Sequence, residues 1–158
     1  MNLNMDKPKL IAKLNQAISL ELGALLQYNQ YSKVLLGHER RVWKDFFEDS
    51  SDESLKHARK FAERVVALSG VPSVEPEAVK QTGDLAEMLA NSLELERRAV
   101  EVYTEALQYV GESVAYRNLL EEQVETETED VEELEKYLNL VSKTPVAAPH
   151  AKRMGKAG

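Results

Sequence analysis

His57 is the residue with the clearest potential for chemistry, because an imidazole stands where an amphipathic helix should show an apolar side chain. On a helix, side chains three and four residues apart share a face, so an inward stripe can be followed along the sequence. The stripe that includes His57 also contains Trp43, Phe47, Phe61, Val65 and Leu68. An isolated inward histidine is more often a hydrogen-bonded core residue than a metal ligand. The interpretation of His57 therefore depends on what other segments place beside it.

Carboxylate side chains interrupt apolar series in three further segments. Glu21 and Glu96 each fill one missing step in a series of helical spacing. Glu127 and Asp130 lie inside a third such series. Glu94 competes with Glu96 for the inward position, but the rest of its face is polar and typical of a solvent-exposed surface. All these inward positions fall near the midpoints of their predicted helices, so in a bundle they would meet at one level.

The two halves of the chain resemble each other around these carboxylates. Glu21 precedes Tyr28 by seven residues and Glu96 precedes Tyr103 by seven residues, so each pair lies two turns apart on one face. The tyrosines fit core packing, the commoner use of such residues, or a redox role beside a metal. The repeat indicates that the chain consists of two similar helix pairs.

The repeat extends to the second helix of each pair. His57 in the first half corresponds to Asp130 in the second, and Ser54 corresponds to Glu127. Position 54 is therefore where a further carboxylate is expected and is missing. Glu53 lies four residues before His57 and could turn inward from the edge of the same face to take its place.

Converging carboxylates point to bound cations. A buried, unpaired carboxylate costs on the order of several kcal/mol, and four at one level would bind protons or metal ions. Two divalent cations would neutralise four carboxylates. Two glutamates and two Glu-x-x-His pairs hold two irons in carboxylate bundles, and such ligands suit iron or manganese, with zinc as a competitor. The alternative is a solvated face with Lys and Arg partners, most plausible for the acidic run from Glu121 to Glu135.

Helices must position these residues, and the apolar periodicity predicts four of them. We expect helices over about residues 9–35, 39–68, 85–110 and 113–141, the second ending at a glycine, Gly70. The proline- and glycine-containing connection at about 70–84 is long for neighbouring helices, which need about 2 to 8 residues. About 15 extended residues reach about 50 Å, more than the length of about 42 Å for a helix of about 28 residues. The prediction is an all-α antiparallel four-helix bundle with a long crossover between its second and third helices.

Composition bounds the remaining possibilities. The chain has 158 residues, of which 43% are hydrophobic and 30% charged, which suits one globular domain over 1–141. It has no cysteine, so thiolate metal sites and disulfides are excluded. No stretch approaches the roughly 20 apolar residues of a membrane span, and no signal peptide is recognisable, so we expect a cytoplasmic protein. The net charge of −7 favours cations over nucleic acid as partners of the folded body.

Four segments resemble the bacterioferritin family, over about residues 9–141. L-N-Q-A-I-S-L-E-L-G-A-L-L-Q-Y is similar to the family's first-helix segment and implies that Glu21 is a metal ligand. S-L-K-H-A-R-K-F-A-E-R resembles the family's E-M-K-H-A segment, which makes His57 a ligand and replaces the bridging glutamate by Ser54. E-M-L-A-N-S-L-E-L-E resembles the third-helix segment and implies that Glu96 is a ligand.

The fourth segment, E-T-E-D, resembles the family's Glu-x-x-His with Glu127 kept and Asp130 in place of histidine. The family's haem-ligating methionine is Leu55 here, so we expect no haem. The resemblance implies a dinuclear iron site, oxidation of Fe(II) by O2 or peroxide, and storage of ferric mineral in a 24-subunit cage. The family's short fifth helix is replaced by residues 142–158, a basic tail that we expect to be flexible.

Two other functions remain open at this stage. With Ser54 in the bridging position, the chain could be a degenerate subunit that builds cages or assembles with an intact, related partner. It could also be a stress protein whose tail binds DNA, but the acidic body opposes this and four tail cations would bind only weakly. Those cations are Lys143, Lys152, Arg153 and Lys156.

Overall fold

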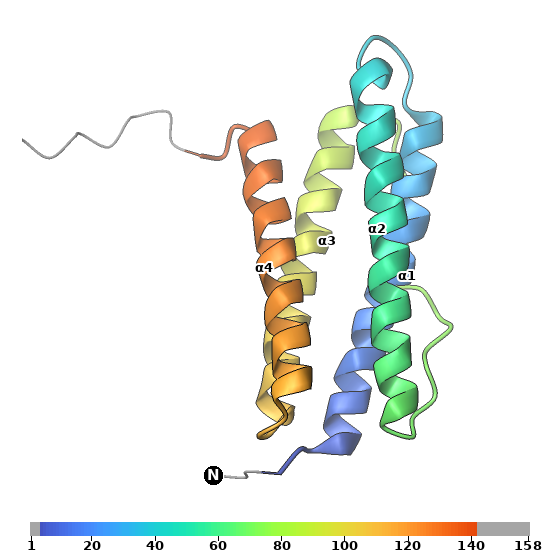
Figure 1. The fold of residues 1–158 in the computed structure, drawn as a ribbon. Coiled ribbons are helices and arrows are strands. Elements are labelled where there is room, and N and C mark those ends of the chain that lie inside the picture. Colours follow the sequence, from blue (N-terminus) through green and yellow to red (C-terminus); the bar gives the residue numbers. More distant parts are fainter. Residues whose placement is uncertain (1–3, 142–158) are drawn as a thin grey trace, which may run out of the picture.

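Four long helices make up the protein in a computed structural model that describes residues 4–141 (Figure 1). They are α1 (Lys7–Val34), α2 (Arg40–Ala67), α3 (Leu85–Ala106) and α4 (Val114–Tyr137), and a short 3₁₀ helix, η1 (Leu107–Tyr109), follows α3. The predicted all-α bundle with a long crossover is confirmed. The basic tail predicted at residues 142–158 lies outside the described residues.

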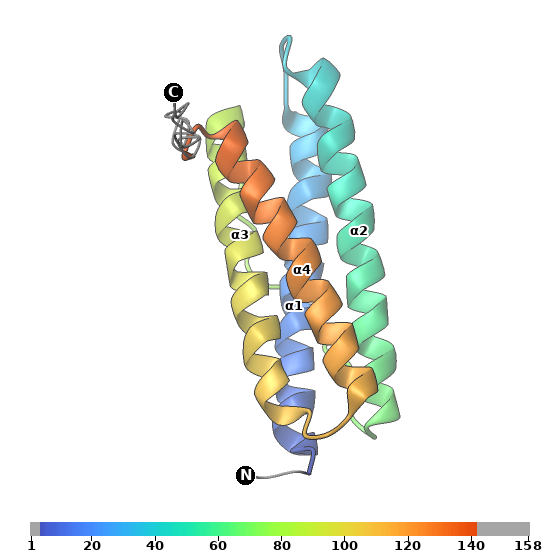
Figure 2. The ribbon, with the colours of Figure 1, turned by 60° about the vertical axis from the view of Figure 1, so that its left-hand side comes forward.

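The helices run in two directions, and the crossover sets which ones are parallel. In Figures 1 and 2, α1 and α4 run one way and α2 and α3 run the other. The connection between α2 and α3 therefore returns along the whole bundle, as its length predicts. None of the helices in the described part is long and apolar enough to cross a membrane.

Local sequence explains where two helices begin. The Asp6 side chain accepts a hydrogen bond from the Lys9 N–H at 3.2 Å, and Pro8 lies in the first turn of α1. Asp84 caps α3 in the same way, accepting from the Glu87 N–H at 3.0 Å. Both are N-terminal caps that satisfy otherwise unpaired backbone donors.

The fourth helix ends earlier than the apolar pattern predicts. Asn139 adopts a left-handed φ of 58°, and the N–H of Leu140 bonds to the Glu135 carbonyl at 2.8 Å. This is a C-terminal cap that closes α4 at Tyr137. Apolar residues beyond it continue the stripe in sequence but no longer belong to the helix.

The end of α2 corrects the role expected for Gly70. The left-handed residue there is Ser69, with a φ of 68°. Gly70 is needed for another reason, because a Cβ at that position would lie 2.9 Å from side-chain atoms of both Ile11 and Val65. The glycine permits close packing of the α2 terminus against α1.

The apolar core has two parts, with a polar layer between them. One part includes Leu14, Phe61, Val65, Tyr103 and Leu120. The other is centred on aromatic and long apolar side chains nearer the other end of the bundle, namely Tyr28, Tyr31, Phe47, Met88 and Leu134. On every helix, the predicted metal-binding position falls between the residues of these two clusters.

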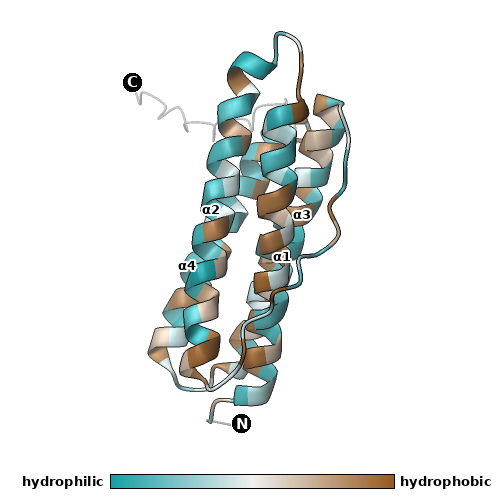
Figure 3. Ribbon diagram, turned by 90° about the vertical axis from the view of Figure 1, so that its right-hand side faces the viewer, coloured by the Kyte–Doolittle hydropathy of each residue, from teal (hydrophilic) through white to brown (hydrophobic). Residues whose placement is uncertain are grey.

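A stripe on α1 holds the crossover in place. Asn15, Ser19, Gly23, Gln27 and Tyr31 follow at every fourth residue and therefore share one face. Four of them hydrogen-bond crossover backbone, with distances between 2.5 and 2.9 Å. At Gly23, a Cβ would lie 2.9 Å from a crossover carbonyl oxygen, so the glycine allows the two backbones to approach. Figure 3 shows the crossover running alongside α1.

Candidate metal centre

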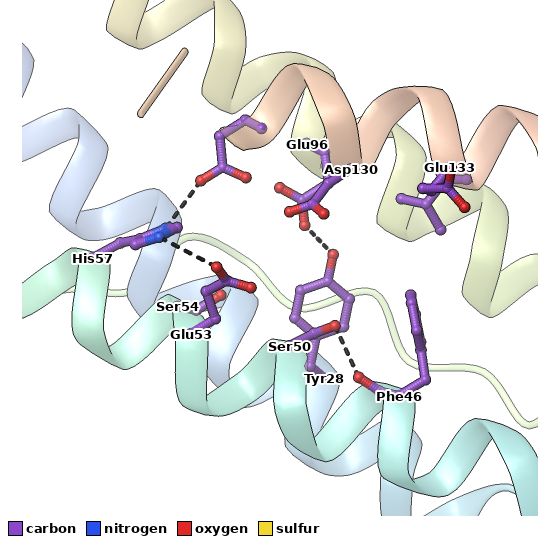
Figure 4. A pocket seen from close by; sticks show the side chains of 11 residues that line it. Tyr28, Phe46, Ser50, Glu53, Ser54, His57, Glu96, Asp130 and Glu133 are labelled. Carbon is purple, nitrogen blue, oxygen red and sulfur yellow. Dashed lines mark hydrogen bonds and ion pairs between the residues drawn. The ribbon is translucent and has the colours of Figure 1, made fainter. Parts of the chain in front are cut away.

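Five side chains from all four long helices meet in the polar layer. Figure 4 shows His57, Glu96 and Asp130 among them. Ligand atoms of Glu21, His57 and Glu127 all lie within 4.8 Å of one another. Those of Glu96, Glu127 and Asp130 lie equally close together. Glu127 belongs to both groups, so the two clusters overlap at one carboxylate, as expected where two metals share a bridging ligand.

His57 points one ring nitrogen at the carboxylates. Its Nδ1 lies 3.1 Å from Oε1 of Glu21, to which it is hydrogen-bonded, and 2.9 Å from Oε1 of Glu127. Nδ1 can carry only one hydrogen, and across residues 4–141 the buried Glu127 oxygen has no hydrogen-bond donor. A buried oxygen without a donor suggests a missing proton or cation at this point.

Tyr28 and Tyr103 form hydrogen bonds with two of the carboxylates. The Tyr28 hydroxyl donates to Glu96 and the Tyr103 hydroxyl donates to Glu21. Each tyrosine thus donates a hydrogen bond to the glutamate of the opposite half of the repeat. The sequence showed the seven-residue spacing, but it could not show that the contacts cross between the halves.

The structure does not bring Glu53 into either group. Its side chain is 49% exposed, and its Oε1 lies 3.8 Å from Nε2 of His57, beyond hydrogen-bond distance. Nε2 is the nitrogen that faces away from Glu21 and Glu127. Ser54 is 5% exposed and lines the cavity, and no carboxylate replaces it in this arrangement. A ligand role for Glu53 stays a prediction that requires its side chain to rotate.

A small cavity, lined mostly by residues of α2 and α4, reaches four of the five residues of the polar layer. It has about 40 Å³ of space for the centres of water-sized molecules. The exposed side chains of Glu53 and Glu133 line it together with His57, Glu96, Glu127 and Asp130. Acidic groups at the exposed side of a cavity attract cations.

Burial and mutual repulsion make the metal-free cluster hold protons. Burial, together with the nearby charge of Glu127, raises the pKa of Glu96 well above its usual value. Burial also raises the pKa of Glu21, although His57 opposes the shift. Burial and the Glu127 charge raise the pKa of Asp130 to about 7. These carboxyl groups are therefore easier to protonate than ordinary ones.

The pKa of His57 is raised because its imidazole lies among carboxylates, which favour the positively charged ring. Burial alone favours the neutral ring, but the contacts with Glu127 and Glu21 outweigh it and raise the pKa of His57 to about 10. Near neutral pH the metal-free imidazole is therefore charged. Metal binding at Nδ1 would displace this proton, so it should be accompanied by proton release.

The residues present fit a pair of divalent cations. No Lys or Arg of the described chain forms an ion pair with Glu21, Glu96, Glu127 or Asp130. The interpretation as a solvated face with basic partners is therefore wrong for these positions. Four carboxylates balance two divalent cations in charge, and oxygen and imidazole donors suit iron, manganese or zinc.

Comparison with known proteins agrees with this geometry. Residues 11–144 match the family model of a ferritin-like domain. The chain belongs to the ferritin-like family. This ferritin-like chain is 30% identical over 143 residues to the bacterioferritin of Brucella melitensis biotype 1, a match that covers 87% of each chain. The predicted resemblance to bacterioferritins is confirmed.

Solved structures with the same fold include diiron proteins. The ferritin-like chain superposes on a ferritin-like, diiron-carboxylate protein from Bacillus anthracis with a TM-score of 0.82 and 31% identity, covering 85% of this chain and 98% of that one. It also resembles a dodecameric thioferritin, the bacterioferritin-related protein of Bacteroides fragilis, with a TM-score of 0.77 and 26% identity. That match covers 86% of this chain and 88% of the other.

Proposed function

We propose that this chain is a subunit of an iron-storage protein that binds two Fe(II) ions in its polar layer, oxidises them and stores the ferric product inside a cage. The observation that supports this most directly is the overlap of two ligand groups at the buried Glu127, since none of their carboxylates pairs with a Lys or Arg within residues 4–141. Glu21 and His57 would hold one ion, Glu96 and Asp130 the other, and Glu127 both. The diiron-carboxylate relative and the bacterioferritin relative support iron as the metal.

In the oxidation, each of two ferrous ions gives one electron to O2, which takes up two protons to become hydrogen peroxide. The chain contributes position, charge and proton sites. Glu127 would hold both ions, and the tyrosine hydroxyls orient Glu96 and Glu21. In the metal-free protein the pKa of the partly buried Asp130 is raised to about 7, so this carboxyl can hold a proton near neutral pH until an ion binds.

Ser54 suggests that oxidation is slower than at a site with two bridging carboxylates. A second bridge would offset the repulsion between the two ions, so its absence should weaken binding of the second ion. Even changes to groups that only orient ligands typically lose about 10 to 100-fold in affinity or activity, and loss of a ligand should be no milder. The same observation favours the second candidate function, a subunit that builds the cage and relies on an intact partner for oxidation.

Anaerobic titration with Fe(II), followed by exposure to O2, separates binding from oxidation. Our proposal predicts about two bound Fe(II) per chain, as expected for a two-metal site, and growth of ferric absorbance after O2 is added. Binding without oxidation would support the cage-building subunit instead. Absence of Fe(II) binding would contradict both.

Two variants identify the missing bridge. Ser54→Glu should speed ferric absorbance growth, because it supplies the second bridging carboxylate. If Glu53 rotates inward to act as the bridge, Glu53→Ala should abolish the remaining oxidation and Ser54→Glu should add little. If neither substitution changes the rate, the polar layer is not the oxidation centre.

Assembly can be tested separately. Bacterioferritin resemblance implies a 24-subunit cage, whereas the Bacteroides fragilis relative is described as a dodecamer. Sedimentation of the full chain distinguishes the two sizes. A monomer, with or without iron, would contradict storage of mineral in a cage.

A further inference from the structure

The two overlapping ligand groups differ in their donor atoms. The first offers one imidazole nitrogen and two carboxylate oxygens, from His57, Glu21 and Glu127. The second offers carboxylate oxygens alone, from Glu96, Glu127 and Asp130. The internal repeat would make the halves equivalent, but it pairs His57 with Asp130, so the symmetry is broken at the ligands themselves.

The first position is the more enclosed. Glu21, His57 and Glu127 are all buried, and Nδ1 of His57 already lies within 2.9 to 3.1 Å of both carboxylates. A ligand set that contains imidazole suits iron or zinc. An ion held here would have few positions left for water.

The second position is more open, and its donor atoms are all hard carboxylate oxygens. Asp130 is only partly buried and lies in the cavity beside the exposed Glu133. Oxygen-only sites suit Mg(II) and Mn(II), and Mg(II) in particular keeps several of its waters in protein sites. Glu127 is 2% exposed and lines this cavity together with Glu96 and Asp130, so the second position has a buried carboxylate as well as a partly exposed one.

We propose that the two positions select different cations, the His57 position taking a transition metal such as Fe(II) or Zn(II) and the Asp130 position accepting a harder, partly hydrated ion such as Mn(II). The centre could then hold a mixed metal pair. This inference rests on the proposed function, because it assigns metals to the same two positions. Zinc binds more tightly than manganese at nearly any such site. The selectivity therefore lies in the ratio of the Zn(II) affinity to the Mn(II) affinity, which should be larger at the His57 position than at the Asp130 position.

Metal binding to the metal-free full chain tests the assignment without measuring oxidation. Calorimetry with Zn(II) should show a tight first equivalent and a weaker second one. Protein loaded with one equivalent of Zn(II) should then bind Mn(II), observed as loss of the electron paramagnetic resonance signal of free hydrated Mn(II).

Variants at each position should separate the two equivalents. Asp130→Asn should weaken Mn(II) binding to the zinc-loaded protein by at least about tenfold and leave the first Zn(II) equivalent unchanged. Glu133→Gln is the matched control, since it removes the same charge from the same helix and cavity and should change neither. Asp130→His should bring the second Zn(II) equivalent close to the first in affinity. His57→Gln should weaken the first Zn(II) equivalent, and circular dichroism would check its folding.

The outcomes distinguish this inference from the proposed function. Two Zn(II) equivalents of equal affinity in the unaltered protein, or equal loss of Mn(II) in Asp130→Asn and Glu133→Gln, would overturn the selectivity and leave iron binding intact. Failure of the unaltered protein to bind Fe(II), Zn(II) or Mn(II) would overturn both proposals.

Discussion

Replacing Glu96 by glutamine should stabilise the metal-free protein and weaken the metal-bound one. Glu96 is buried, its pKa is raised well above 4.5 by burial and by Glu127, and its only hydrogen-bond donor in residues 4–141 is the Tyr28 hydroxyl. Glutamine keeps the shape and the carbonyl acceptor for Tyr28 and removes the ionisable group. Glu96→Gln therefore isolates the cost of holding a proton in the cluster.

The sign and size follow from the linkage between protonation and folding. The pKa of Glu96 is higher in the folded state than in the unfolded state. Its contribution to the free energy of unfolding is therefore fully present below the unfolded pKa and is lost as the pH rises towards the folded pKa. The loss is about 1.4 kcal/mol per pH unit in that interval. Glu96→Gln lacks this pH-dependent loss, so its free energy of unfolding should rise relative to that of the unaltered protein as the pH increases above the unfolded pKa of Glu96.

Urea unfolding with a chelator present, at fixed protein concentration, measures this difference. Glu101→Gln, an exposed change on the same helix, is the control and should show no comparable pH-dependent gain. With excess Zn(II) the order should reverse, because ligand binding stabilises the folded state and the variant lacks one ligand. If metal-free Glu96→Gln is less stable than the unaltered protein near neutral pH, the carboxyl group is satisfied as it stands and the argument for a cation there fails.

Three substitutions and the addition of haem test other parts of the structure. Gly23→Ala should destabilise the protein by about 1 to 3 kcal/mol in urea unfolding, because its Cβ would meet a crossover carbonyl at 2.9 Å. Gly83→Ala, with open space at its Cβ, should be neutral or slightly stabilising, and equal effects would contradict the described path of the crossover. Tyr103→Phe should cost the metal-free protein about 1 to 3 kcal/mol by removing a donor from buried Glu21, and an unchanged unfolding midpoint would argue against that hydrogen bond. Added haem should give no Soret band of bis-thioether ligation, since Leu55 has no sulfur, and such a band would refute that expectation.

Much of the architecture follows from local patterns in the sequence. The apolar periodicity predicted four helices, and the length of residues 70–84 predicted a crossover that spans the bundle. Helix ends were less accurate, because a left-handed cap such as Asn139 depends on backbone conformation that an apolar stripe does not record. The stripe on α1 that holds the crossover was missed, although its four-residue spacing was visible, because polar residues on a helix surface usually face water.

The sequence by itself determined which residue types reach the polar layer. Glu21, His57, Glu96, Glu127 and Asp130 occupy inward positions because helical periodicity fixes the face on which a side chain lies. Only the tertiary structure decided their partners, because contacts between helices depend on how the helices are rotated and spaced against one another. That packing assigned Glu127 to both ligand groups.

Packing also left Glu53 outside the centre and crossed the two tyrosines to the opposite halves of the repeat. A position next to an inward residue in sequence lies about 100° away around the helix, so Glu53 could reach the centre only by rotation of its side chain. The sequence determined that four carboxyl groups and one imidazole face inward at one level of this bundle. The tertiary structure decided that the two groups of possible ligand atoms are unequal, because one contains an imidazole and the other contains carboxylate oxygens alone.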